Sequence, residues 1–233
     1  MQVKKIKAYM DGYRAFLQNE ELADKRMYIW ESQKIFQENW DLEARDLQSM
    51  FNQSLQNSKT RRLWSRESYA PKVMMRHFAG LQPDFFRQMF LDLFNETKSA
   101  EGRIGRFVFY CHEMLNAYLE KTPKSRERQH YHDDGYQMIS IYLCFKYPMQ
   151  YIPYRLDIFQ DVLQKIGAVD QPLTHDTERY FKVAKTLYKM LQKEEDIMEM
   201  HQARLGPDHY EEETLLLAYD FMYSIFKNKE EVS

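Results

Sequence analysis

The stretch 101-EGRIGRFVFYCHEMLNAYLEK-121 decides the fold class, because its apolar residues return every three or four positions. That spacing follows the helical turn and places the apolar side chains on one face. The residues of this face are Ile104, Phe107, Val108, Cys111, Met114, Leu115, Tyr118 and Leu119. The stretch therefore predicts a helix that packs against a hydrophobic core.

The same period continues along most of the chain, and no segment alternates apolar and polar residues for long enough to predict a strand. A long helix is expected at 176–205, stopped by Gly206-Pro207. Asp208 and Glu211 are spaced as a capping box that would begin a buried helix reaching residue 226. Further helices are predicted at 3–18, 21–38, 42–56, 69–79, 83–96 and 138–145, and in a segment that ends at Gly167.

These elements predict an all-α protein, a compact multi-helix domain of roughly nine or ten helices in a bundle or orthogonal arrangement. Residues 1–233 are expected to form a single helical module. The polar, aperiodic stretch 122–135 is the one soft point at which it could divide.

Composition limits the partners. The chain has 233 residues, 33 of them basic and 35 acidic, so its net charge of -2 gives no general attraction to nucleic acid or to an anionic membrane. No apolar run approaches the about 20 residues of a membrane span. Cys111 and Cys144 are too few for a disulfide framework, so a cytoplasmic location is expected.

The stretch 130-HYHDDGYQ-137 concentrates residue types that bind metal ions. A metal held by His130, His132 and Asp133 would need further ligands from elsewhere in the fold. His77, His112 and His175 could supply them. The competing interpretation is favoured: Asp134 and Gln137 have the spacing of a helix cap, so no metal site is expected.

A sharper version of the metal hypothesis is the HD phosphohydrolase pattern, in which a His-Asp dyad binds a divalent ion. Two such dyads occur, His132-Asp133 and His175-Asp176, with His77 or His112 upstream and Asp220 downstream as further candidates. Both dyads lie in polar, turn-like sequence. The second is therefore interpreted as the start of a helix.

Motifs for nucleotide or nucleophilic catalysis are not found. The segment 102-GRIGR-106 lacks the GxxxxGK[ST] order of a phosphate-binding loop and falls inside the predicted helix 101–121. Neither a GxSxG elbow nor a catalytic-cysteine context occurs. The chain is expected to be non-enzymatic, with no catalytic residues and no cofactor.

Two basic clusters are candidates for nucleic-acid contact. The first combines cations with aromatic residues, as phosphate neutralisation and base stacking require. Its candidate residues are Lys59, Arg61, Arg62, Trp64, Arg66, Lys72 and Arg76, with Tyr69 as a second aromatic group. The second cluster is Lys124, Arg126 and Arg128. The alternative for both is a solvated loop or helix end with acidic neighbours.

Several stretches together resemble the helical region N-terminal to the motor of McrB-like AAA+ restriction nucleoside triphosphatases, large bacterial AAA family ATPases. The resemblance rests on aromatic and acidic landmarks in order over most of the chain. The stretches are 27-MYIWESQKIFQENWDLEARDLQSMF-51, 85-FFRQMFLDLFNE-96, 103-RIGRFVFYCHEML-115, 130-HYHDDGYQMISIYLCFKYPMQYIPYR-155 and 207-PDHYEEETLLLAYDF-221.

The resemblance implies a module that recognises a target, often modified DNA, while a motor outside this chain hydrolyses GTP or ATP and a nuclease subunit cuts. Because the chain has no P-loop, Walker B or nuclease motif, neither hydrolysis nor cleavage is assigned to it. The leading hypothesis is a non-catalytic recognition or adaptor module of a restriction or phage-defence system that contacts DNA through residues 59–76. The alternatives are a protein-binding module for a partner subunit or phage protein, and an HD-type metal phosphohydrolase.

Overall fold

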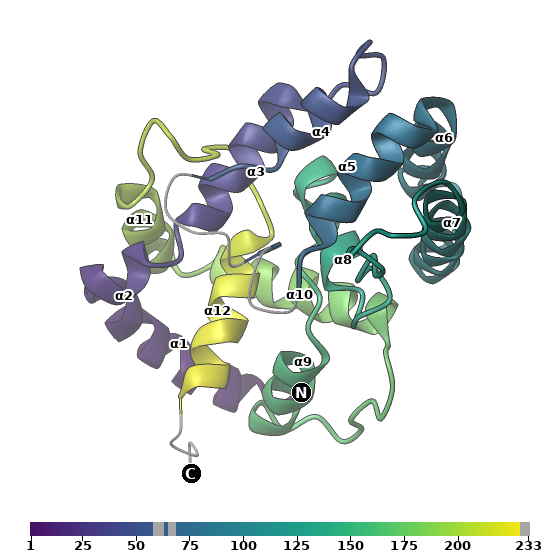
Figure 1. The fold of residues 1–233 in the computed structure, drawn as a ribbon. Coiled ribbons are helices and arrows are strands. Elements are labelled where there is room, and N and C mark those ends of the chain that lie inside the picture. Colours follow the sequence, from purple (N-terminus) through teal and green to yellow (C-terminus); the bar gives the residue numbers. More distant parts are fainter. Residues whose placement is uncertain (58–62, 65–68, 229–233) are drawn as a thin grey trace.

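The computed structural model describes residues 1–57, 63–64 and 69–228, and this part of the chain forms helices and loops without a strand (Figure 1). The all-α prediction is confirmed. The helices are α1 (Val3–Gln18), α2 (Glu20–Asp24), α3 (Tyr28–Asn39), α4 (Leu47–Ser54), α5 (Pro71–Leu81), α6 (Pro83–Leu93), α7 (Ala100–Lys121), α8 (Gln137–Lys146), α9 (Leu156–Lys165), α10 (Thr177–Leu191), α11 (Glu195–Ala203) and α12 (Leu216–Lys227).

Helix α7 is the core helix that the periodicity predicts. The hydroxyl of Ser99 accepts a hydrogen bond from the Gly102 amide and caps the helix start. The buried residues of its inner face are Ile104, Phe107, Cys111, Met114 and Tyr118. Helix α7 packs against α5 and α6 in the half of the molecule shown at the right of Figure 1.

Two helices are apolar almost all round and lie inside the molecule. Every residue of α8 from 138 to 145 is buried, and α12 is buried from Leu216 to Met222. Helix α12 packs against α1, α9 and α10, so the first and last helices of the chain lie side by side (Figure 1). The central position predicted for the C-terminal helix agrees with its burial.

Stacked and edge-on aromatic rings fill the space between the helices. Phe90 of α6 lies 4.7 Å from Trp40, 5.1 Å from Phe107 and 5.1 Å from Tyr142, measured between ring centres. Such contacts stabilise a core beyond the area that they bury. The buried apolar residues form one continuous cluster, which explains the use of so many aromatic side chains.

A charged cluster ties α12 to the rest of the fold. The Asp220 carboxylate, fully buried, accepts hydrogen bonds from Tyr13 Oη (3.0 Å), Arg204 Nη2 (2.8 Å) and Arg26 Nε. Burial alone would raise the pKa of Asp220, but the two guanidinium groups outweigh it and hold the pKa below its ordinary value. One carboxylate thus joins α1, the α2–α3 turn, the end of α11 and α12.

Several predicted helix boundaries are wrong. The helix predicted at 21–38 is two helices, α2 and α3, and the one predicted at 42–56 begins only at Leu47. Asp134 does not cap α8, because Gly135 (φ 66°) and Tyr136 (φ 57°) are left-handed and Tyr136 occupies the N-cap position without a side-chain cap. Asp208 does not begin a helix, since α12 starts at Leu216. The predicted helix 176–205 is two helices, α10 and α11, separated by a turn.

Among the described residues, no helix is both long and apolar enough to cross a lipid bilayer.

Candidate functional site

The basic segment predicted to contact DNA is described in part. Lys59, Arg61, Arg62 and Arg66 lie outside the described residues. Trp64 is only 3% exposed and Tyr69 only 5%, so neither ring offers an open face for base stacking as the sequence suggested. The remaining two members, Lys72 and Arg76, both belong to α5.

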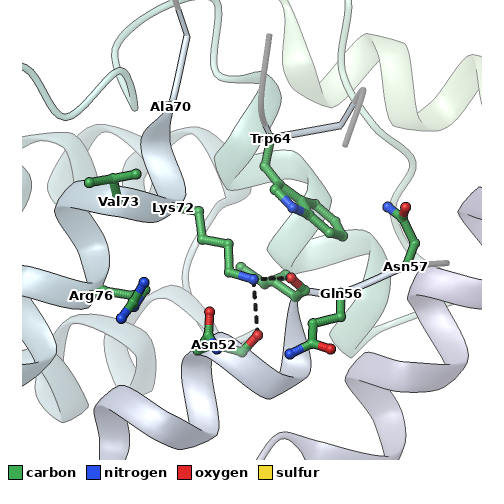
Figure 2. Close-up of a pocket in the computed structure, with 9 residues that line it drawn as sticks. Asn52, Gln56, Asn57, Trp64, Ala70, Lys72, Val73 and Arg76 are labelled. Carbon is green, nitrogen blue, oxygen red and sulfur yellow. Dashed lines mark hydrogen bonds between the residues drawn. The ribbon is translucent and has the colours of Figure 1, made fainter. Parts of the chain in front are cut away.

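Lys72 stabilises the C-terminal end of α4. Its Nζ donates to the main-chain oxygens of Asn52 (3.0 Å) and Leu55, at the C-terminal end of α4 (Figure 2). A cation at this end satisfies carbonyls that the helix leaves unpaired and complements the helix dipole. The same Nζ lies 5.9 Å from the ring centre of Trp64. Lys72 therefore joins α5 to the end of α4, and Arg76 is the exposed cation one turn further along α5.

These side chains border a cavity of about 450 Å³ between α4 and α5, here called the α4–α5 cavity (Figure 2). Asparagine and glutamine amides, two cations and the edge of the Trp64 ring make up its wall. No acidic side chain of the described chain lines it. The lining residues are Asn52, Leu55, Gln56, Asn57, Trp64, Ala70, Lys72, Val73 and Arg76.

A second cavity, about 490 Å³ in volume, lies between α2 and α12 and was not predicted; it is called the α2–α12 cavity. Side chains from five helices and the connecting segments surround it, and most of them are aromatic or basic. Its lining residues are Phe16, Leu22, Lys25, Arg26, Tyr28, Leu63, Gln137, Arg155, Tyr219, Tyr223 and Lys227. Leu63 of the basic segment lies in this wall, next in sequence to Trp64 in the other cavity. A sequence signal existed: Tyr219, Tyr223 and Lys227 recur every four residues and share a face of α12.

The histidine candidates come together more closely than the sequence could show. His130 Nε2 lies 3.0 Å from His112 Nδ1, and Asp133 oxygens lie 3.9 Å from a nitrogen of each ring. Ligand atoms of these three residues lie within 4.8 Å of one another, beside a cavity of about 390 Å³. Buried Cys111 and His132 form a second such group with His130.

Hydrogen bonds decide the protonation of this cluster. The His132 amide donates to His130 Nδ1 at 3.0 Å, so His130 carries its proton on Nε2 and donates it to His112 Nδ1. His132 Nδ1 donates to the main-chain oxygen of His130 (2.6 Å), and its Nε2 accepts from Tyr142 Oη (3.1 Å). Burial lowers the pKa of His130 to about 4 and that of His132 to about 3. Both rings are neutral, and their lone pairs are used within the protein.

The residues of the HD hypothesis do not form one site, although His112 lies 3.9 Å from Asp133. His132 is fully buried while the Asp133 side chain is 53% exposed. Asp176 caps α10 by accepting from the Arg179 amide at 3.0 Å, as the helix-start interpretation predicts. His175 lies between aromatic rings, 4.8 Å from Tyr136. Asp220, finally, is bound by arginines in the charged cluster.

The two cysteines are buried, and burial raises the pKa of both thiols well above the ordinary value. A thiolate is the reactive form of cysteine, so neither residue has the environment of a nucleophile. In the second basic cluster Lys124, Arg126 and Arg128 are exposed, and Arg128 borders the cavity beside the histidines.

Comparison with known proteins gives no relative: no protein family, no curated protein and no solved structure matches the chain.

Proposed function

We propose that this chain is a non-catalytic helical recognition or adaptor module of a McrB-like restriction or phage-defence ATPase, and that its ligand is DNA. Residues 59–76 would be the contact segment. The motor and the nuclease subunit of such a system would be its functional partners. The resemblance supports this proposal, since α3, α6, α7 and α8 carry four of the stretches on which it rests.

One observation carries the assignment of DNA as the ligand. The neighbouring residues Leu63 and Trp64 line two different cavities, and the described residues that line either cavity include cations but no carboxylate. Four of the segment's cations, Arg61 and Arg62 among them, flank this pair in the sequence. In sequence, residues 59–76 therefore carry an excess of positive charge in a chain whose net charge is close to zero, as phosphate binding requires.

The test is binding of purified protein to labelled duplex DNA, with and without modified cytosine, across a series from about 50 to 200 mM salt. Phosphate contacts release counterions, so affinity should fall steeply with salt. The Arg61→Ala, Arg62→Ala double variant should reduce the log-log slope by about 1.8, since each phosphate contact contributes about 0.9. Lys193→Ala, an exposed lysine in the turn after α10, serves as the matched control and should bind as wild type does.

No binding at the lowest salt would reject DNA as the ligand. Equal salt slopes for the double variant and wild type would reject Arg61 and Arg62 as its phosphate contacts. A preference for modified over unmodified cytosine would show that the module reads bases.

A second candidate function, a protein-binding module for a partner subunit or phage protein, is favoured by exposed apolar side chains. Val169 is 96% exposed and Leu173 91%, in the segment between α9 and α10. Because contiguous apolar surface is where partner proteins bind, this segment is the place at which such a contact would form. Co-purification with motor and nuclease subunits, lost in a Val169→Ser, Leu173→Ser variant, would support this function. Unchanged co-purification would exclude the pair as the contact.

A further inference from the structure

The wall of the α2–α12 cavity contains both aromatic and basic side chains, a combination that the packing of helices does not require. Tyr219 and Tyr223 of α12 form one side, and Phe16 of α1 and Tyr28 of α3 form others. Tyr223 and Phe16 are half-buried, so their rings are accessible from the cavity. The volume of about 490 Å³ falls in the range of about 300–1,000 Å³ found for small-molecule sites.

Arg26 stands at the inner end of the lining and is held rigidly. It is 8% exposed, its Nε donates to Asp220, and its guanidinium carbon lies 3.7 Å from the ring centre of Tyr223 and 5.3 Å from that of Tyr219. Its Nη2 has no hydrogen-bond partner among the described residues. A buried donor left without a partner is costly, and the positive charge of this guanidinium favours an anion nearby.

The positive charge of Arg26 is not fully balanced by the carboxylate buried beside it. Asp220 serves two buried guanidinium groups, those of Arg26 and Arg204, so this cluster keeps one excess positive charge. Positive charge in a poorly solvated place acts at longer range than on the surface. The interior behind the cavity therefore favours an anion in it.

The outer part of the cavity adds further cations. Lys227 is exposed, with its Nζ 5.6 Å from the ring centre of Tyr223. Lys25 and Arg155 also line the wall, and their carboxylate partners lie outside the lining, on side chains that are 80% and 53% exposed. Exposed ion pairs of this kind are weak, so both cations can turn to a ligand. None of the described lining residues is acidic.

We infer that the α2–α12 cavity binds a nucleotide, that is, a planar base joined to a phosphate group. The base would lie against Tyr223 and its aromatic neighbours, and the phosphate would be bound by Lys227 together with Lys25 or Arg155. This inference does not rest on the proposed function, because it uses none of the cations of residues 59–76.

The test is isothermal titration calorimetry with AMP, adenosine and ribose 5-phosphate as probes. Since both parts of the ligand are bound, AMP should bind at least about tenfold more tightly than either fragment. Lys227→Gln should weaken AMP about tenfold and leave adenosine unchanged, whereas Tyr223→Leu should weaken both. Lys4→Gln is the control, an exposed lysine of α1 about 18 Å along the helix from Phe16. Both test residues are outside the buried core, and circular dichroism would verify that each variant is folded.

Three results would overturn the inference: no heat with millimolar AMP, ribose 5-phosphate binding as tightly as AMP, or both variants binding as Lys4→Gln does. A ten-residue oligodeoxyadenylate separates the two sources of this chemistry. Tighter binding of the oligomer than of AMP would show that the cavity takes a unit of a strand, and weaker binding that it takes a free nucleotide. If an Arg61→Ala, Arg62→Ala variant no longer bound DNA but still bound AMP, the nucleotide site would be distinct from the proposed DNA-contact segment.

Discussion

Replacement of Asp220 by alanine should remove much of the free energy of unfolding. The carboxylate is fully buried and is bound by Arg26, Arg204 and Tyr13. Its loss would leave two guanidinium groups, each less than a tenth exposed, without the anion that compensates them. Breaking a buried ion pair by removing one partner costs about 3–5 kcal/mol. A protein of this size has in total about 5–15 kcal/mol.

The assay is thermal and urea unfolding followed by circular dichroism. For a chain of 150–250 residues each kcal/mol corresponds to about 2–4 °C, so Tm should fall by about 6–20 °C. Asp157→Ala is the matched control, because its pair with Arg155 is exposed and its removal should cost no more than about 1 kcal/mol. If Asp220→Ala were no more destabilising than Asp157→Ala, the charged cluster would not stabilise the fold and the reasoning would be refuted.

Four further predictions follow from other contacts. The pKa values of His132 and His201 are lowered to about 3 by burial, and for His201 also by a nearby arginine, so the unfolded chain binds protons that the folded chain does not. Stability should be complete above pH 6.5 and fall by about 1.4 kcal/mol per pH unit for each histidine as the pH decreases toward 3, measured by urea unfolding at several pH values. Lys72→Met should lower stability by about 1 kcal/mol, because the end of α4 loses its charged donor; urea unfolding that matched wild type would contradict this. Ser140→Ala should cost about 1–3 kcal/mol in the same assay, since the buried Tyr154 amide loses its acceptor at 2.7 Å. Purified protein should contain less than stoichiometric zinc by elemental analysis, because the lone pairs of the histidine cluster are already used; one zinc per chain, lost on His112→Ala, would reverse that conclusion.

The helices with a single buried face could be predicted from the sequence. In α7 and α6 the period of the apolar residues coincides with the burial in the structure, because a helix that packs by one stripe records that stripe in its sequence. Helix ends were harder where tertiary hydrogen bonds compete. The acidic residues after Asp208 resemble a helix start, but the Tyr210 amide donates to the Trp30 carbonyl and the Leu215 amide to the Pro148 carbonyl. Those distant acceptors hold residues 207–215 in turns and bends, not in a helix, until α12 begins.

The candidate sites were even harder to predict from the sequence than the helix ends, because tertiary packing decides which residues meet. That His112 joins His130 could not be known, because the link depends on how the loop after α7 folds back on the helix. The α2–α12 cavity gathers residues from Phe16 to Lys227, and their proximity results from packing alone. Only its α12 face was visible in the sequence, as a four-residue spacing of Tyr219, Tyr223 and Lys227.

The packing of α1 against α12 also has a consequence for how the protein is made. Tyr13 and its acceptor Asp220 are 207 residues apart, and a ribosome that adds about 5–20 residues per second needs about 10–40 s to translate that interval. Throughout it, the face of α1 that ends beside α12 has no permanent neighbour. Helix α1 is thus completed by a helix that is synthesised about 200 residues later, and chaperones have tens of seconds in which to bind it.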